Sequence, residues 1–226
     1  RHTRFKCDWS SDVCSSDLLA GITQLGSVEL LMGVYAQLPV KTVGDLIALA
    51  KAQPGKLNYA SFGHGSIAQL AAELFKQATG TNIVHIAYKS TPQAVQETIA
   101  GQTQFLFGGI PYMLPHARAG RLNGIAVSTL QRSPFAPDIP TLDEAGVRGF
   151  HVPAWFGMWV PAKTLRPIVA RIHEVVVKAM NDVRPAIEKQ GFKPGGDRPE
   201  EFDKFMRSEV EKFSRVIKTA NIKPEN

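Results

Sequence analysis

Two serines, a histidine and two glycines stand within the six residues of segment 61–66 (SFGHGS). Ser66 suits the N-cap of a helix, because a serine oxygen accepts from a backbone N–H two or three residues further on. Gln69 follows three residues later and predicts a capping box. The remaining N–H groups of such a first turn, helped by the helix dipole, form a site for a phosphate or a carboxylate. The segment therefore predicts either an anion-binding turn or a turn that serves packing alone.

The same residue types are those of nucleophilic catalysis. Ser61 and Ser66 lie near His64, and Asp138 or Asp143 is available as an orienting acid. However, the chain has no G-x-S-x-G nucleophile elbow, and the short spacing of Ser61 and His64 implies no triad geometry. The six histidines show neither H-E-x-x-H nor another paired-ligand spacing. We therefore expect no catalytic residue, no metal site and no cofactor, and a serine-type hydrolase is kept as an alternative.

Composition is that of an ordinary globular protein. The 226 residues are 44% hydrophobic and 20% charged, which is enough for one large domain or two small ones. The formal net charge is +6, but the basic residues are scattered, so we expect no nucleic-acid partner. No apolar run approaches the roughly 18 residues that a membrane span needs.

The first eighteen residues show neither the helical nor the strand periodicity and contain no apolar segment of a signal peptide. Residues 7–18, CDWSSDVCSSDL, are the translation of a string that resembles a sequencing-library adapter. We interpret 1–18 as an untrimmed adapter fused in frame to a partial gene. Cys7 and Cys14 are the only cysteines, so on this interpretation they do not indicate a redox compartment, and the lack of a signal peptide is uninformative.

Strands alternate with helices along the first half of the remaining chain. Strands, or a strand pair at the first position, are expected at 22–37, 57–60, 82–87, 104–107 and 123–129. Helices are expected at 42–53, from Ser66 to Gly80, from Thr91 as N-cap to 101, and at 111–119. This alternation predicts an α/β fold with an open, mostly parallel sheet.

The second half is richer in helices. A proline-rich loop at 131–140 precedes a short helix that Thr141 and Glu144 cap, and 154–160 (AWFGMWV) predicts an aromatic strand. Helices are expected at 164–180, 183–190 and 199–220. Three amphipathic helices with almost no strands to cover are a mismatch, which agrees with a missing N-terminal portion.

Several segments, in order, resemble the Bug (TctC-type) substrate-binding proteins of tripartite tricarboxylate transporters: LPVKTVGDLIALAKAQPGKLNYASFGHGS, AAELFKQATGTNIVHIAYKS, RSPFAPDIPTLDEAG and AWFGMWVPAKT. The resemblance runs from about Ile22 to Ile222. It implies a periplasmic-binding-protein-like fold (type II, Venus flytrap) with two lobes. The chain would cross between them near Pro39 and Pro153. Residues 19–39 and 153–226 would then form an incomplete first lobe and 40–152 a complete second lobe.

The resemblance also implies a function. Such proteins capture a carboxylated small molecule, here a di- or tricarboxylate or an aromatic acid, between the lobes and deliver it to the membrane subunits of the transporter. The implied localisation is the periplasm, and we expect a monomer that is not an enzyme. The ligand-sensing flytrap domain of a transcription regulator is a further alternative, although no helix-turn-helix segment is visible.

The ligand contacts that the resemblance implies for the second lobe lie on three loops. They are Ser61, Phe62, Gly63, His64, Gly65 and Ser66 on the first, Tyr88, Lys89 and Ser90 on the second, and Gly108 and Gly109 on the third.

Some of these positions, and a few neighbours, have two interpretations. His64, where the family often has asparagine, either donates to a carboxylate or fills a surface loop. Lys89 either adds charge to the site or lies in solvent, and His85 is expected to be packed or solvent-facing rather than a ligand. Gly108-Gly109 replaces an acidic residue and an asparagine, which makes room for a larger or aromatic acid. Two aromatic residues, Trp155 and Phe156, either wall the cleft or belong to the core.

Overall fold

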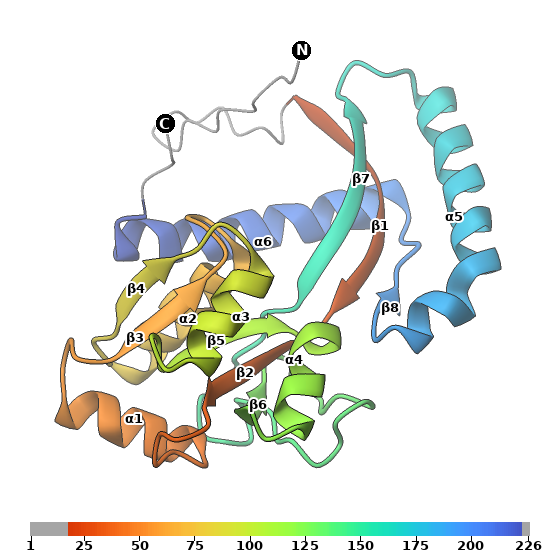
Figure 1. Ribbon diagram of the computed structural model, residues 1–226. Coiled ribbons are helices and arrows are strands. Elements are labelled where there is room, and N and C mark those ends of the chain that lie inside the picture. The colour runs from red at the N-terminus through yellow and green to blue at the C-terminus, as the bar shows by residue number, and fades with distance from the viewer. Residues whose placement is uncertain (1–17, 223–226) are drawn as a thin grey trace. The chain divides into compact units, whose positions relative to one another are not determined.

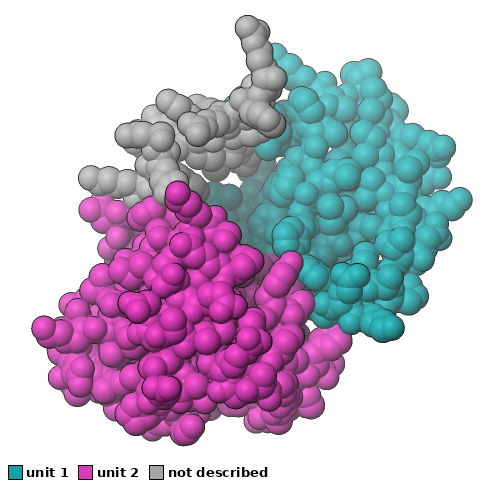
Figure 2. All heavy atoms as spheres, in the orientation of Figure 1, with its two compact units in different colours: residues 1–27, 155–215 teal, residues 28–154, 216–226 magenta. Residues whose placement is uncertain are grey.

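The computed structural model describes residues 18–222, which fold into two compact units (Figures 1 and 2). The described part of unit 1 comprises 18–27 and 155–215, and that of unit 2 comprises 28–154 and 216–222. The contacts thus divide the chain at Val28 and Trp155. The family resemblance predicts crossings near Pro39 and Pro153. The identity of the two units with the two lobes stays a prediction.

A five-stranded sheet forms the centre of unit 2. Its strands are β2 (Leu30–Tyr35), β3 (Asn58–Ser61), β4 (Val84–Ala87), β5 (Phe105–Gly109) and β6 (Leu122–Val127), in the order β4-β3-β5-β2-β6. The strand β3 runs parallel to β4 and β5, whereas β2 is antiparallel to β5 and β6. The expected α/β class is confirmed, but the expected mostly parallel sheet is wrong: because β2 runs against both of its neighbours, two strand pairs are parallel and two are antiparallel. Because β2 is bonded on both sides within this sheet, the segment that follows Val28 belongs to unit 2.

Four helices join these strands (Figure 1): α1 (Val43–Ala52), α2 (Ile67–Thr79), α3 (Thr91–Ile99) and α4 (Ile110–Arg118). Side chains of alternating residues point to opposite faces of a strand, and the two faces have different partners. Phe75 of α2 packs against Phe105, which stacks on Tyr59. On the other face, a buried cluster joins Ala60 and Leu106 to residues of α3 and α4.

The helix ends follow the expected local chemistry with small shifts. Thr42 and Asp45 form the capping box of α1, and Gly80 ends α2 in the left-handed conformation. The N-cap of α3 is Ser90 rather than Thr91. Thr141 and Glu144 make their mutual capping contacts, yet no helix forms there, because Gly146 at φ +98° ends the segment after a single turn.

Unit 1 contains a small sheet in the order β7-β1-β8 and two long helices. The strands are β1 (Leu19–Val28), β7 (Ala154–Pro161) and β8 (Lys193–Pro194), and the helices are α5 (Arg166–Lys189) and α6 (Pro199–Ala220). The two helices expected at 164–180 and 183–190 form the single helix α5, which continues through Asn181 and Asp182 and contains Pro185, although proline is unfavourable in a helix interior. The last residues of α6 belong to unit 2, where Gln77 donates to the Val216 carbonyl.

Candidate functional site

Three loops gather at the carboxyl edge of the sheet in unit 2. Because β3, β4 and β5 are parallel neighbours, their carboxyl ends lie at the same edge. The loops that leave this edge are 61–66, 88–90 and 108–109, which are the loops expected to bind the ligand. Their spatial grouping follows from the topology, and whether each residue contacts a ligand stays a prediction.

The first loop is a tight turn held by two glycines. Gly63 has a φ of +115° and Gly65 a φ of +72°, both in the region that disfavours residues with a Cβ. The Ser66 N–H donates to the Gly63 carbonyl at 3.3 Å, and the Ser66 hydroxyl accepts from the Gln69 N–H at 3.4 Å. Ser66 is therefore the N-cap of α2, as the sequence predicts.

The second half of the predicted capping box is wrong. The Gln69 side chain accepts from the N–H of Gly65 at 2.7 Å, one residue before the N-cap. It does not accept from the Ser66 N–H, because that group already donates to the Gly63 carbonyl. The turn is thus tied down at Gly65 by a side chain of the helix that it opens.

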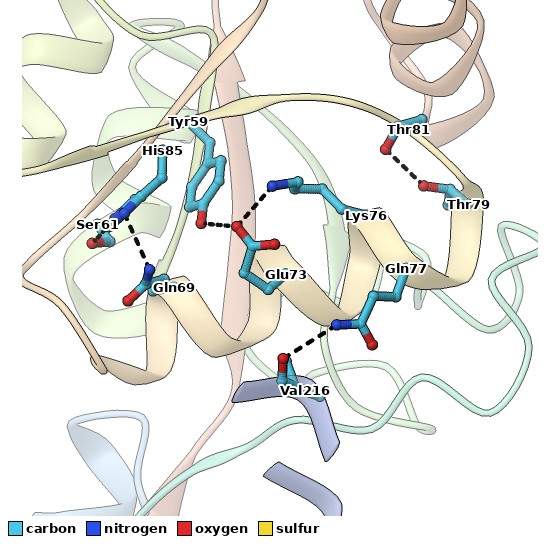
Figure 3. Close-up of polar contacts among 10 residues, drawn as sticks. All are labelled: Tyr59, Ser61, Gln69, Glu73, Lys76, Gln77, Thr79, Thr81, His85 and Val216. Carbon is cyan, nitrogen blue, oxygen red and sulfur yellow. Dashed lines mark hydrogen bonds and ion pairs between the residues drawn. The ribbon is translucent and has the colours of Figure 1, made fainter. Parts of the chain in front are cut away.

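A directed chain of hydrogen bonds starts at this contact, and Figure 3 shows its part from Gln69 through His85 to Ser61. Because the Gly65 N–H is a donor, the Gln69 amide atom that faces it is Oε1. The Nε2 of Gln69 therefore faces His85 Nδ1, at 3.1 Å, and donates to it. The other ring nitrogen, His85 Nε2, lies 2.6 Å from Ser61 Oγ, and the Ser61 hydroxyl donates to the Gly63 carbonyl at 3.0 Å.

These contacts assign the protonation of His85. With Nδ1 accepting, the neutral ring carries its hydrogen on Nε2 and donates to Ser61. Burial, and then the neighbouring His64, lower the pKa of His85 from 6.5 to about 4, so the ring is neutral near pH 7. Ser61 is fully buried and Gln69 is 4% exposed, whereas His85 is partly buried and Gly65 is exposed, so the chain of bonds runs from the interior to the surface.

A second polar group lies beside His85 and consists of Tyr59 of β3 with Glu73 and Lys76 of α2. The Tyr59 ring stacks on His85 with centroids 4.9 Å apart, and its hydroxyl donates to Glu73 at 2.6 Å. Lys76 donates to the same Glu73 oxygen at 2.8 Å (Figure 3). Burial, and then the bond to Glu73, raise the pKa of Tyr59. These contacts fix the surroundings of the His85 ring.

Several backbone N–H groups of the first loop remain for a ligand. Gly63, His64 and Ile67 are each at least partly exposed, and within residues 18–222 their N–H groups have no acceptor. The first turn of α2 contains no acidic residue, and neither does that of α3 or α4. By contrast, the first turn of α1 contains Asp45, which accepts from two backbone N–H groups. The positive N-terminal ends of α2, α3 and α4 are therefore not neutralised by an acidic side chain of their own first turns.

Each of the first two loops has an exposed side chain that could reach a ligand. His64 is exposed and meets the His85 ring edge-on at 5.2 Å. In the second loop, Tyr88 packs against the buried cluster under α3 and α4, whereas Lys89 is exposed. The Ser90 hydroxyl accepts from the Gln93 N–H as the helix cap. The exposure of Lys89 agrees with either of its two interpretations.

The two glycines of the third loop point to different faces of the sheet. A Cβ on Gly108 would lie 2.8 Å from Met113 Cγ and Sδ, on the face that α4 covers. A Cβ on Gly109 would meet Val28 and Pro111 only at ordinary contact distances of 3.7 and 3.8 Å. The absence of a side chain at Gly108 therefore serves packing, and the position with room for one is Gly109.

In unit 1, the aromatic strand β7 has one partly buried and one exposed candidate. Trp155 donates to Glu209 and packs against Phe202 and Phe205, which is the arrangement of a core residue. Phe156 is 52% exposed and meets Phe192.

The sequence interpretation did not single out Gln69 and His85 as partners. One signal was present, because Gln69 stands one helical turn after the N-cap. The parallel register of β3 and β4, which pairs Tyr59 with His85, was not visible in the sequence. In the part of the chain that the structure describes, no three His, Cys, Asp or Glu residues are placed to hold a metal ion. No helix there is long and apolar enough to cross a membrane.

Comparison with known families gives one match over nearly the whole chain. Residues 2–222 match the family described as "Tripartite tricarboxylate transporter family receptor" (TctC). A UPF0065 protein of Pseudomonas sp. strain P51 is 31% identical over 180 residues, which are 78% of this chain and 54% of that protein. Another, of Bordetella bronchiseptica, is 32% identical over 87% of this chain and 58% of its own length. The chain thus spans about half the length of these relatives.

Solved structures resemble the fold. The structure titled "R. palustris Rpa4515 with adipate" superposes with a TM-score of 0.81 at 30% identity, over 92% of this chain and 70% of that one. The periplasmic binding protein BugD superposes with a TM-score of 0.76 at 24% identity, over 92% of this chain and 71% of its own, and supports the fold alone.

Proposed function

This chain belongs to the tripartite tricarboxylate transporter receptor (TctC) family, and we propose that it is an extracytoplasmic binding protein for a carboxylated small molecule. Its proposed ligands are di- or tricarboxylates or aromatic acids. Its proposed partners are the membrane subunits of a tripartite transporter, its proposed location is the periplasm, and its proposed state is a monomer. A ligand-sensing domain of a regulator is not favoured, because the match is to a transport receptor family.

One observation supports the ligand class most directly. The Gly63–Ile67 turn offers backbone donors without an internal acceptor in the described chain, at a helix start that contains no acidic residue. Such a turn favours an anion through its N–H groups and through the helix dipole. A carboxylate that accepts several N–H bonds is also oriented by them. Since Rpa4515 was solved with adipate, we take this dicarboxylate as the first probe.

A serine hydrolase is the alternative that the Ser61–His85 distance of 2.6 Å favours. Nucleophilic catalysis requires the histidine to accept the serine proton. Here the bonds run the other way, because His85 Nε2 donates to Ser61 and the Ser61 hydroxyl donates to the Gly63 carbonyl. We therefore propose that this pair is structural and that the protein has no catalytic function.

The proposed site is tested by placing a bulky side chain beside the donors. Gly65 and Gly80 have similar φ angles of +72° and +62°, stand at opposite ends of α2, and have no atom within 4 Å of the place that a Cβ would take. Gly65→Leu and Gly80→Leu should therefore each lower the free energy of unfolding by about 1–2 kcal/mol. In calorimetric titrations with adipate, only Gly65→Leu should lose affinity, by about tenfold or more.

The matched pair separates binding from stability. An affinity loss confined to Gly65→Leu supports the turn as the binding element. Wild-type affinity in Gly65→Leu, or equal losses in both variants, would contradict a ligand at this turn.

A further inference from the structure

Two side chains outside the expected ligand set control the geometry of the turn. Gly65, at its centre, has its N–H held by Gln69 Oε1, and Gln69 is held in turn by His85 Nδ1. We propose that His85 and Gln69 are positioning residues for ligand binding, because together they fix the Gly63–Ile67 turn through the Gly65 N–H. This inference rests on the proposed function for its effect on affinity.

Gln69 alone does not specify this arrangement. A primary amide can rotate by a half-turn and exchange its oxygen and nitrogen with little change in shape. If the amide turned, an NH₂ group would face the Gly65 N–H, donor against donor. The lone pair of His85 Nδ1 accepts only from the nitrogen, so the ring selects the orientation that presents Oε1 to Gly65.

The ring is in turn fixed from its other side. His85 Nε2 donates to Ser61, whose own hydrogen is directed to the Gly63 carbonyl. The bonds therefore form a closed path that leaves the turn at Gly63 and returns to it at Gly65. Each bond direction in the path depends on the next, and two of its side chains, Ser61 and Gln69, are buried, where an unmade hydrogen bond is costly.

Two conservative substitutions of His85 divide its two roles. An asparagine amide oxygen takes the place of Nδ1, so His85→Asn keeps an acceptor for Gln69. A glutamine amide nitrogen reaches the place of Nε2, so His85→Gln keeps the donor to Ser61 and leaves Gln69 without its acceptor. Both variants lose the ring that stacks on Tyr59, which makes them controls for each other.

The first measurement needs no ligand. Hydrogen exchange of the Gly65 amide is measured in the full 226-residue chain. It should be about fivefold or more faster in His85→Gln than in wild type, because Gln69 loses the acceptor that orients its Oε1 toward the Gly65 N–H. In His85→Asn it should stay near the wild-type rate. Nitrogen NMR of the wild-type imidazole should show the hydrogen on Nε2. Equal exchange in the two variants, or a hydrogen on Nδ1, would overturn the proposal.

The second measurement uses adipate as the probe. Its affinity should fall several-fold in His85→Gln and stay near that of wild type in His85→Asn. If exchange follows the prediction but both variants bind adipate equally, the positioning role is overturned. If the wild type itself does not bind adipate, the proposed ligand fails, and the exchange rates still decide whether His85 fixes the turn.

Discussion

The ring of His85 is neutral because it is partly buried beside Tyr59, and because His64 meets its edge. In that state it can accept at Nδ1 and donate at Nε2 at the same time, as its contacts with Gln69 and Ser61 require. A charged ring has two donors and cannot accept from Gln69. The hydrogen bonds that hold the turn therefore require the neutral form of His85.

The lowered pKa of His85 predicts that the free energy of unfolding depends on pH. The pKa of His85 is lowered from 6.5 to about 4 in the folded protein, so between these values the unfolded chain binds a proton that the folded chain does not. The free energy of unfolding is therefore fully retained above pH 6.5 and falls as the pH drops toward 4. Solvent screening of this partly exposed ring limits the loss to about 1–2 kcal/mol.

Urea unfolding at several pH values between about 7 and 4.5 measures the effect. The control is His85→Asn, which keeps the acceptor for Gln69 but cannot titrate, so its stability should change less over the same interval. The same pH dependence in the variant as in the wild type would assign the titration to other groups.

Two neighbouring glycines of β5, Gly108 and Gly109, differ in the room that the packed elements leave for a side chain. Met113 of α4 lies over both Gly108 and Gly33, where a Cβ would approach it to 2.8 and 2.4 Å. At Gly109, one residue further on, the atoms nearest to such a Cβ belong to Val28 and Pro111, at 3.7 and 3.8 Å. Alternation along β5 thus separates a packing position from one at the loop edge.

Stability measurements on two alanine variants test this separation. Gly108→Ala should lower the free energy of unfolding by about 1–3 kcal/mol, because Met113 must move. Gly109→Ala should change it by about 0.5 kcal/mol or less, since its Cβ meets only ordinary contacts. Equal effects, measured by thermal or urea unfolding, would show that α4 does not pack as described.

The elements themselves follow largely from local sequence. Helical periodicity and the cap at Ser66 predict α2, and the left-handed Gly80 ends it as expected. What the sequence could not supply is the register between β3 and β4, because strand pairing is a long-range choice. That register places His85 beside Tyr59 and within reach of Gln69, so the predicted turn was correct while its supporting partners were missed.

For the molecule as a whole, the order of strands accounts for the grouping of the candidate site. The α/β alternation predicts parallel strands, and parallel neighbours bring their following loops to one edge. The family resemblance seen in the sequence is confirmed by the match over residues 2–222. The individual ligand contacts stay predictions, because the same turn geometry serves packing in proteins that bind nothing there.

We propose that a carboxylate binds the N–H groups of the Gly63–Ile67 turn that have no acceptor in the described chain. The most direct test follows the backbone amide signals of the ¹⁵N-labelled chain by NMR during titration with adipate and, separately, with its uncharged diamide. We expect adipate to shift the amides of Gly63, His64 and Ile67, Gly80 at the far end of α2 to stay unchanged, and the diamide to have little effect. Equal shifts with the diamide, or adipate shifts that leave these three amides unmoved, would contradict the claim.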